Sequence, residues 1–186
     1  MILVYAIILL ILLALLFRRD LGLVTQCAYR GGWAATGLVA ALFILQAVTV
    51  LYAPGQTRWQ MAVLVLTQSA ITGLLFLNRH LPGAKIFALG LILNLAVMAA
   101  NGGWMPVTPE TSAFVHPERT VEAYARPPSS KNIVLERSET RLWILSDIIR
   151  LTLPWQRTAI SLGDALLIVG AGQFIFQATK EEKNDR

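Results

Sequence analysis

Four polar side chains interrupt stretches that are otherwise apolar, and they are the first candidates for chemistry. They are Gln46, Gln68, Asn94 and Asp164. A polar group in hydrocarbon is costly, so each one needs a partner or a purpose. Amide and carboxyl groups can hydrogen-bond a small polar or amphiphilic ligand. They can also join helices through bonds worth about 0.6–2 kcal/mol each. The sequence leaves both interpretations open, and a proton relay or catalysis is a weaker third one.

Asp164 is the only carboxylate inside any predicted membrane span. An ionised carboxylate in lipid is expensive, so it must be protonated or paired with a cation. We expect the cation to come from above, from Arg141, Arg150 or Arg157. Ser161 lies three residues earlier and shares a helix face with Asp164. The sequence therefore predicts that Asp164 is the charged centre of any site.

Residue patterns for other kinds of chemistry are missing. The two histidines, His80 and His116, fall on opposite sides of the membrane in the predicted topology and cannot share a metal ion. Cys27 is the only cysteine, which excludes an internal disulfide. There is no nucleophile elbow, phosphate loop, dinucleotide fingerprint or zinc-protease motif. We predict no catalytic residue, no metal and no cofactor, and the sequence favours a protein that is not an enzyme.

The elements that must position these residues are long apolar segments. The chain has 186 residues, of which 55% are hydrophobic and 15% charged. Apolar runs of about 20 residues match the ~30 Å hydrocarbon core of a bilayer. The sequence predicts an all-α fold, a polytopic helical membrane bundle that forms one domain over residues 1–186. It has five spans and an outer segment at 101–157; the spans cover about 2–17, 33–52, 59–78, 83–100 and 158–179.

Basic residues predict how this bundle is oriented. Cytoplasmic loops are enriched in Lys and Arg. With the N-terminus outside and the C-terminus cytoplasmic, the short outer loop near residue 58 holds only Arg58. The inner segments then hold Arg18, Arg19, Arg30, Arg79, Lys85, Lys180, Lys183 and Arg186. We therefore predict a multi-pass protein of the bacterial cytoplasmic membrane, with Trp59, Trp104, Trp143 and Trp155 at its outer interface.

Spacing along the predicted spans brings the four polar side chains to a similar depth. At 1.5 Å per residue, all four fall roughly 9–14 Å below the outer surface. Asn94 and Asn101 are seven residues apart, which places them on one helix face together with Gly90. The sequence thus predicts one polar layer in the outer leaflet, with Gly90 allowing a close approach by a neighbouring helix or a ligand.

The outer segment is predicted to cover this layer. "RLWILSDIIRL" (141–151) is apolar apart from polar residues that fall largely on one side, a pattern typical of an amphipathic helix in the membrane interface. Its lid residues are Arg141, Trp143, Asp147 and Arg150. Pro154 is expected to end this helix.

"NGGWMPV" (101–107) is predicted to join the fourth span to the lid. Gly102 and Gly103 can adopt the left-handed turn that closes a helix C-terminus. Pro106 prevents the helix from resuming. Two interpretations of this stretch are open: a simple helix stop, or a hinge between pocket and lid.

Three segments together resemble a family of small bacterial polytopic membrane proteins that is known as a domain of unknown function. They are "NRHLPGAKIFALGLILNLAVMAANGGWMPV" (78–107), "RLWILSDIIRL" (141–151) and "SLGDALLIVG" (161–170). The earlier "RGGWAATGLVAALFILQ" (30–46) also resembles the second span of that family, which ends in a Gln. The Asn-Gly-Gly-aromatic-Met-Pro element is the most specific of them, and Ser146 stands where Gly is expected. The resemblance implies that one ensemble contains Gln46, Asn94, Asn101, Gly102, Gly103, Met105, Pro106, Trp143, Asp147, Ser161, Gly163 and Asp164.

Two main functions fit these predictions. The first is a binding or permease-like protein for a small polar or amphiphilic solute at the outer polar layer. The second is a structural accessory subunit of a larger membrane complex. An enzyme acting on a lipid headgroup is the weakest alternative. The expected partners are membrane lipids, and either other membrane subunits or further copies of the chain; no basic patch with interleaved aromatic residues predicts nucleic-acid binding.

Overall fold

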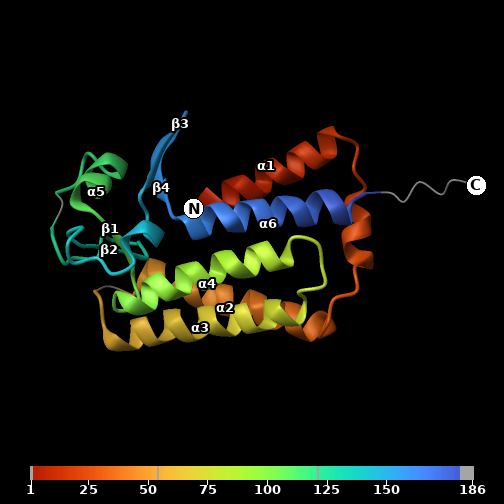
Figure 1. The fold of residues 1–186 in the computed structure, drawn as a ribbon, viewed down its shortest axis with the longest axis horizontal. Coiled ribbons are helices and arrows are strands. Elements are labelled where there is room, and N and C mark those ends of the chain that lie inside the picture. The colour runs from red at the N-terminus through yellow and green to blue at the C-terminus, as the bar shows by residue number, and fades with distance from the viewer. Residues whose placement is uncertain (1, 54, 121, 181–186) are drawn as a thin grey trace, which may run out of the picture.

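Five long helices lie side by side in the computed structural model (Figure 1). The structure describes residues 2–53, 55–120 and 122–180, so Lys183 and Arg186, both used to predict orientation, lie outside the described residues. The five helices are α1 (Ile2–Leu16), α2 (Gly32–Tyr52), α3 (Arg58–Leu77), α4 (Ala84–Ala100) and α6 (Leu162–Ala178).

Two of these helices, α2 and α3, are long and apolar enough to cross a membrane. The apolar helices α1, α4 and α6 are shorter, with 15, 17 and 17 residues. Only 6% of the most apolar part of α2 is buried in the protein, compared with 28% for α3. Most of the apolar surface of α2 therefore faces outward.

The closest helix pair is α4 with α6, and glycines allow its approach. A Cβ added to Gly163 would lie 2.1 Å from Oδ1 of Asn94 and 2.8 Å from the carbonyl oxygen of Gly90. Near the other end of the pair, a Cβ on Gly83 would lie 2.1 Å from the carbonyl oxygen of Gly170. Small residues let helix backbones approach in this way, as predicted for Gly90.

Residues 101–120 and 122–161 form the capped end of the bundle. The short strands β1 (Met105–Val107) and β2 (Asn132–Val134) pair in parallel there. β3 (Ile149–Leu153) and β4 (Gln156–Ile160) form an antiparallel hairpin. The helix α5 (Pro109–Val115) and the 3-10 turn η2 (Trp143–Leu145) complete the cap.

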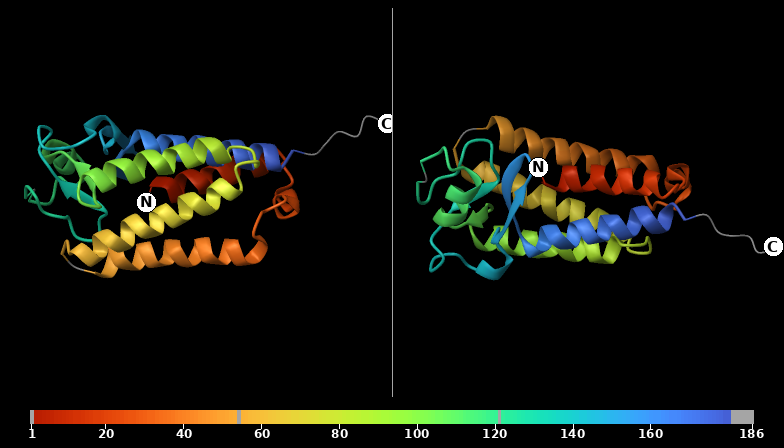
Figure 2. Two further views of the ribbon diagram at one scale, coloured as in Figure 1. Left: turned by 60° about the horizontal axis from the view of Figure 1, so that its bottom comes forward. Right: turned by 90° about the horizontal axis from the view of Figure 1, so that it is seen from above.

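The opposite end is formed by the 3-10 helix η1 (Leu21–Gln26) and its neighbours. We call it the η1 end; it comprises residues 17–31, the loop 78–83 and the C-terminal half of α6. The two views in Figure 2 show that the cap and η1 lie at opposite ends of the helices. Along α2 and α3 the chain runs from the η1 end to the capped end and back.

The predicted amphipathic helix at 141–151 is wrong, and the fold is not purely helical. Residues 143–145 make one 3-10 turn, and 149–153 form strand β3. In the register, Ile149 faces Ile160 and Leu153 faces Gln156, so the hairpin turns at Pro154 and Trp155. A short apolar run suits a helix or a strand equally, and here pairing with the following strand β4 decides between them.

That hairpin also shortens the fifth predicted span. Residues 158–160 belong to β4, and α6 begins at Leu162. Asp164 therefore lies in the first turn of α6 and not about six residues below its start.

The predicted helix stop after Ala100 is confirmed. Gly102 and Gly103 have φ angles of 73° and 85°, in the left-handed region that favours glycine. The Gly103 N–H donates to the carbonyl of Met98 at 2.7 Å. Trp104, predicted at the membrane interface, is instead 3% exposed and packs in a core cluster with Leu64 and Met98.

Candidate functional site

Three of the predicted polar residues form one hydrogen-bonded cluster between α4 and α6. Nδ2 of Asn94 donates to Oδ1 of Asp164 at 2.8 Å, and Oγ of Ser161 donates to Oδ1 of Asn94 at 2.8 Å. All three residues are buried. The Asn94 side chain thus uses both its amide nitrogen and its oxygen to join the two helices.

Local helix chemistry places Ser161 and Asp164. Ser161 is the N-cap of α6, and its hydroxyl accepts a hydrogen bond from the Asp164 N–H at 2.9 Å. A serine cap satisfies one of the free N–H groups of the first turn. The carboxylate of Asp164 in that turn is favoured by the helix dipole. The sequence pattern Ser-Leu-Gly-Asp therefore builds its own anion position at the helix start.

The cation beside Asp164 is Lys131, not one of the predicted arginines. Nζ of Lys131 lies 3.8 Å from Oδ2 of Asp164. Sequence reasoning missed Lys131 because it follows an irregular stretch far from the predicted lid. One signal was available, since Lys131 is the only lysine in residues 101–157.

The arginines expected to approach Asp164 lie elsewhere. Nε of Arg150 donates to Oγ1 of Thr111 at 3.1 Å, and the guanidinium groups of Arg150 and Arg157 lie over the Phe114 ring. Arg141 contributes its backbone, as both donor and acceptor, to the side chain of Asn101.

Asn101 fastens the end of α4 to the cap in this way. Its Nδ2 also donates to the carbonyl of Val97 at 2.7 Å. The lid residue Trp143 stacks under the guanidinium of Arg137, whose Cζ lies 3.9 Å from the ring centroid.

Asp147, the acidic lid residue, is 3% exposed and lies close to Lys131 and Asp164. Its Oδ2 accepts a hydrogen bond from Nδ2 of Asn132 at 2.7 Å. Among the described residues, its buried Oδ1 has no hydrogen-bond partner. The pKa of Asp147 is raised to about 6, chiefly because burial disfavours the carboxylate; Lys131 and the Asn132 hydrogen bond lower it, and Asp164 raises it.

The pKa of Lys131 is also raised in these surroundings, and for a lysine a raised pKa favours the charged form. Burial disfavours its charged form, but the carboxylates of Asp164 and Asp147 outweigh that effect and raise the pKa of the ammonium group above its ordinary value. The lysine therefore stays charged between the two acids.

The Met-Pro part of "NGGWMPV" is the frame that holds these groups. The Met105 N–H donates to the carbonyl of Lys131 at 3.0 Å, and the Asp147 N–H donates to the carbonyl of Pro106 at 3.3 Å. Met105 and Pro106 are fully buried. Strand β1 thus holds the chain segments of Lys131 and Asp147 on either side of it. We call the resulting group the polar centre: Asn94, Lys131, Asn132, Asp147, Ser161 and Asp164.

The remaining two polar residues of the predicted layer form a separate pair. Nε2 of Gln46 lies 3.3 Å from Oε1 of Gln68 and 2.7 Å from Oγ1 of Thr67. In the part of the chain that the structure describes, hydrogen bonds join Gln46 with α3 and Asn94 with α6. The four residues form two pairs of helix contacts rather than one connected layer.

Arg126 is a second residue of the cap that the sequence did not single out. Its guanidinium donates to the carbonyls of Val50, Ala53 and Gly55 at the C-terminal end of α2. It also lies over the ring of Trp104, with Cζ 4.6 Å from the centroid. A basic group at a helix C-terminus satisfies free carbonyls and is favoured by the helix dipole. Arg126 therefore attaches the cap to α2.

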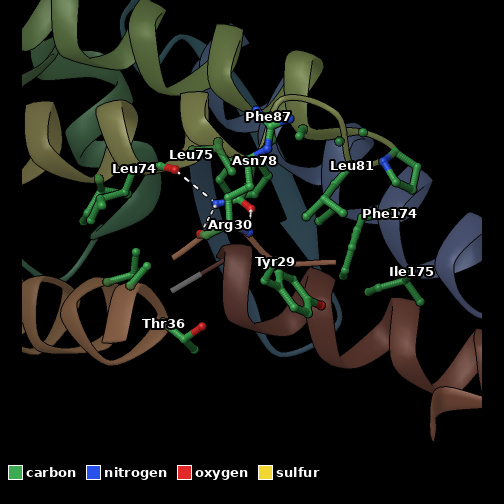
Figure 3. Close-up of a pocket in the computed structure, with 18 of the residues that line it drawn as sticks. Tyr29, Arg30, Thr36, Leu74, Leu75, Asn78, Leu81, Phe87, Phe174 and Ile175 are labelled. Atoms are coloured by element: carbon green, nitrogen blue, oxygen red, sulfur yellow. Dashed lines mark hydrogen bonds between the residues drawn. The ribbon is translucent and has the colours of Figure 1, made fainter. Parts of the chain in front are cut away.

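A cavity of about 450 Å³ lies at the η1 end, among α1, α2, α3, α4 and α6 (Figure 3). Most of its lining is aliphatic or aromatic, and this volume is within the ~300–1,000 Å³ range of small-molecule sites. Polar groups line one edge, where the Asn78 amide and the Arg30 backbone exchange hydrogen bonds. Residues that line the pocket include Val39, Phe43, Leu74, Phe87 and Phe174.

The chain belongs to a family of unknown function (DUF5317), whose model matches residues 32–176. This range covers the bundle from α2 to α6 together with the whole cap. An uncharacterized protein of Thermotoga maritima is 34% identical over 110 residues. That match covers 55% of each chain, so the protein spans about half the length of the curated relative it matches. No solved structure matches the chain.

Proposed function

We propose that this protein is a five-span integral membrane protein that binds an amphiphile in the apolar pocket at its η1 end. Helix α2 supports the membrane assignment because it is strongly apolar and yet only 6% of its most apolar part is buried. A core helix of a soluble protein hides its apolar surface, whereas a lipid-facing helix displays it. The 17 residues of α4 and of α6 reach the lower limit of ~17 residues for a span.

In this proposal the capped end faces outward and the η1 end lies on the cytoplasmic side. Basic residues support this orientation, since Arg18, Arg19, Arg30, Arg79 and Lys85 all belong to the η1 end or border it.

Topology can be tested with two single cysteines in a Cys27→Ser background. Gln26→Cys lies at the η1 end, Ser138→Cys lies in the cap, and both positions are exposed. A membrane-impermeant maleimide should label position 138 in intact cells and position 26 only after permeabilisation. Labelling of position 26 alone in intact cells would reverse the orientation. Recovery of the protein in the soluble fraction would refute the membrane assignment.

The pocket is the observation that supports ligand binding. It is an apolar volume with polar groups at one edge, which matches a molecule that has an apolar chain and a polar head. The polar centre offers less to a ligand, because Asn94, Ser161 and Asp164 bond to one another and Asp164 pairs with Lys131. We therefore assign the polar centre a packing role and move the ligand site from the outer leaflet to the η1 end.

Binding can be tested by filling the pocket. Val39→Trp adds bulk to a lining residue, whereas Val48→Trp changes an exposed residue of the same helix. Protein purified in mild detergent should retain lipid that mass spectrometry detects. Val39→Trp should lose this lipid, and Val48→Trp should keep it. Equal retention by both variants would contradict a site in the pocket.

The second candidate function is an accessory subunit or homo-oligomer that uses the outward face of α2. The observation in its favour is again the exposure of α2, whose Leu38, Ile44 and Leu51 are 49%, 63% and 51% exposed. Crosslinking in membranes from a cysteine at position 44 distinguishes the two: a specific protein adduct supports a subunit, and reaction with lipid alone supports a lipid-facing helix.

A further inference from the structure

We propose that the occupant of the pocket is an anionic phospholipid, with one acyl chain inside and its phosphate beside Arg30. This inference rests on the proposed function and adds the chemical class of the ligand. It depends on three features: the basic residues of the η1 end, the Arg30 backbone held by Asn78, and the pocket wall formed by the exposed apolar helix α2.

The η1 end is strongly basic. Arg30 lines the pocket, and Arg79 and Lys85 directly follow the lining residues Asn78 and Ala84 in the chain. Arg18, Arg19 and Lys180 lie at the same end. Such a cluster attracts an anionic headgroup.

Acidic groups do not compete for these cations in the described part of the η1 end. Its one acidic residue, Asp20, caps η1 by accepting a hydrogen bond from the Gly22 N–H at 2.7 Å. The three ion pairs among the described residues all lie at the capped end. Among the described residues, the basic groups of the η1 end therefore have no ion-pair partner.

The Asn78 side chain holds the backbone of Arg30 at the polar edge. Its Oδ1 accepts from the Arg30 N–H at 2.8 Å, and its Nδ2 donates to the carbonyls of Arg30 and Leu74 at 3.3 Å. Figure 3 shows these bonds at one side of the pocket. A guanidinium on a fixed backbone suits phosphate, because its planar donors can bind two oxygens at once.

The apolar wall indicates a membrane lipid as the source of this headgroup. The α2 side of the pocket includes Val39 and Phe43, on a helix that is less buried in the protein than α3. An acyl chain can enter from the bilayer along this helix while its phosphate stays at the interface. Arg30 in the lining, with Arg79 and Lys85 next to lining residues in the chain, also suits a phospholipid phosphate in the cytoplasmic leaflet better than a single carboxylate.

The test measures lipid selectivity by electron spin resonance in phosphatidylcholine vesicles that contain the full-length protein. The probes are spin-labelled phosphatidylglycerol, phosphatidylcholine and stearic acid. We expect immobilised phosphatidylglycerol to exceed phosphatidylcholine by about fivefold, since one basic group near the headgroup contributes roughly 1 kcal/mol. Arg30→Gln should abolish most of this preference, and Arg58→Gln, at the opposite end, should leave it intact.

The outcomes separate the two proposals. Equal immobilisation of the two phospholipids, with both lost in Val39→Trp, overturns the anionic assignment and keeps the amphiphile site. Absence of any lipid that Val39→Trp removes overturns both. A preference for stearic acid over phosphatidylglycerol that depends on Arg30 overturns the phospholipid assignment. If Arg30→Gln fails to fold, Arg30→Lys replaces it, and the preference should then fall but not vanish.

Discussion

The two ends of this bundle treat their polar groups in opposite ways. At the capped end, Asn94, Ser161, Asp164 and Lys131 lie within hydrogen-bonding or ion-pair distance of one another. At the η1 end, an apolar cavity of about 450 Å³ has Arg30 in its lining. Buried polar groups that satisfy one another fix how helices pack, whereas a cavity with charge at its edge can accept a ligand.

This difference shows that buried polarity alone does not mark a binding site. The polar centre drew attention in the sequence because its residues are rare in apolar helices. The structure pairs them through helix capping, a close glycine contact and one lysine. The pocket is built from ordinary Leu, Phe and Val side chains, which no motif distinguishes from a core.

The largest expected loss of stability comes from a substitution at the closest contact between α4 and α6, at the capped end. Gly163→Ala would place a Cβ 2.1 Å from Oδ1 of Asn94, so α6 must move away from α4. We expect a loss of about 4 kcal/mol in the free energy of unfolding, from overpacking together with the broken hydrogen bonds. Thermal unfolding in detergent measures this. Gly37→Ala is the control, because nothing lies within 4 Å of its Cβ, and it should be neutral or stabilising.

A somewhat smaller loss of stability is expected when the Asp147 carboxyl group ionises. The folded carboxyl holds its proton up to about pH 6, whereas the unfolded one releases it near the ordinary value of 3.8. The protein should therefore lose about 2–3 kcal/mol of stability as the pH rises from about 4 to 6, at 1.36 kcal/mol per pKa unit. Asp147→Asn should remove this dependence in denaturant titrations. The exposed Glu122→Gln should keep it, and an unchanged slope in Asp147→Asn would contradict the prediction.

The next largest loss of stability is expected when the hydrogen bonds that attach the cap to α2 are removed. Arg126→Gln removes guanidinium hydrogen bonds to the α2 carbonyls, and we expect a cost of about 2 kcal/mol. Faster hydrogen exchange should follow in the last turn of α2, with little change in α4. Arg119→Gln, which removes only a surface ion pair with Glu118, is the control. Equal exchange in both variants would show that Arg126 does not hold α2.

The smallest effect on stability is expected at the η1 end. Enlarging a side chain in a packed core costs about 1–3 kcal/mol. Val39→Trp instead places its ring in a cavity of about 450 Å³, so we expect the free energy of unfolding to fall by no more than about 1 kcal/mol, the lower end of that range. Lipid retention should nevertheless fall, as described above. A large loss of stability would instead indicate that the wall at Val39 belongs to the core.

Sequence reasoning succeeded where local chemistry decides the structure. The stop at Gly102 and Gly103 follows from backbone conformations that favour glycine. Most helix bounds follow from apolar length. Failure came where pairing between two segments decides, as for residues 149–153, which form a strand because residues 156–160 fold back beside them. The apolar pattern of 141–151 does not show that this partner exists. That turn also moved Asp164 to the start of α6.

By itself the sequence determined the family, the apolar helices and the residues Asn94, Ser161 and Asp164 as members of one group. Only the tertiary structure decided that Lys131 is their cation, that Gln46 and Gln68 form a separate pair, and that the cavity lies at the opposite end. The physical reason is how far apart along the chain the interacting residues lie. Helix length, capping and glycine turns depend on neighbours along the chain, whereas ion pairs and cavities depend on which surfaces meet when the helices pack.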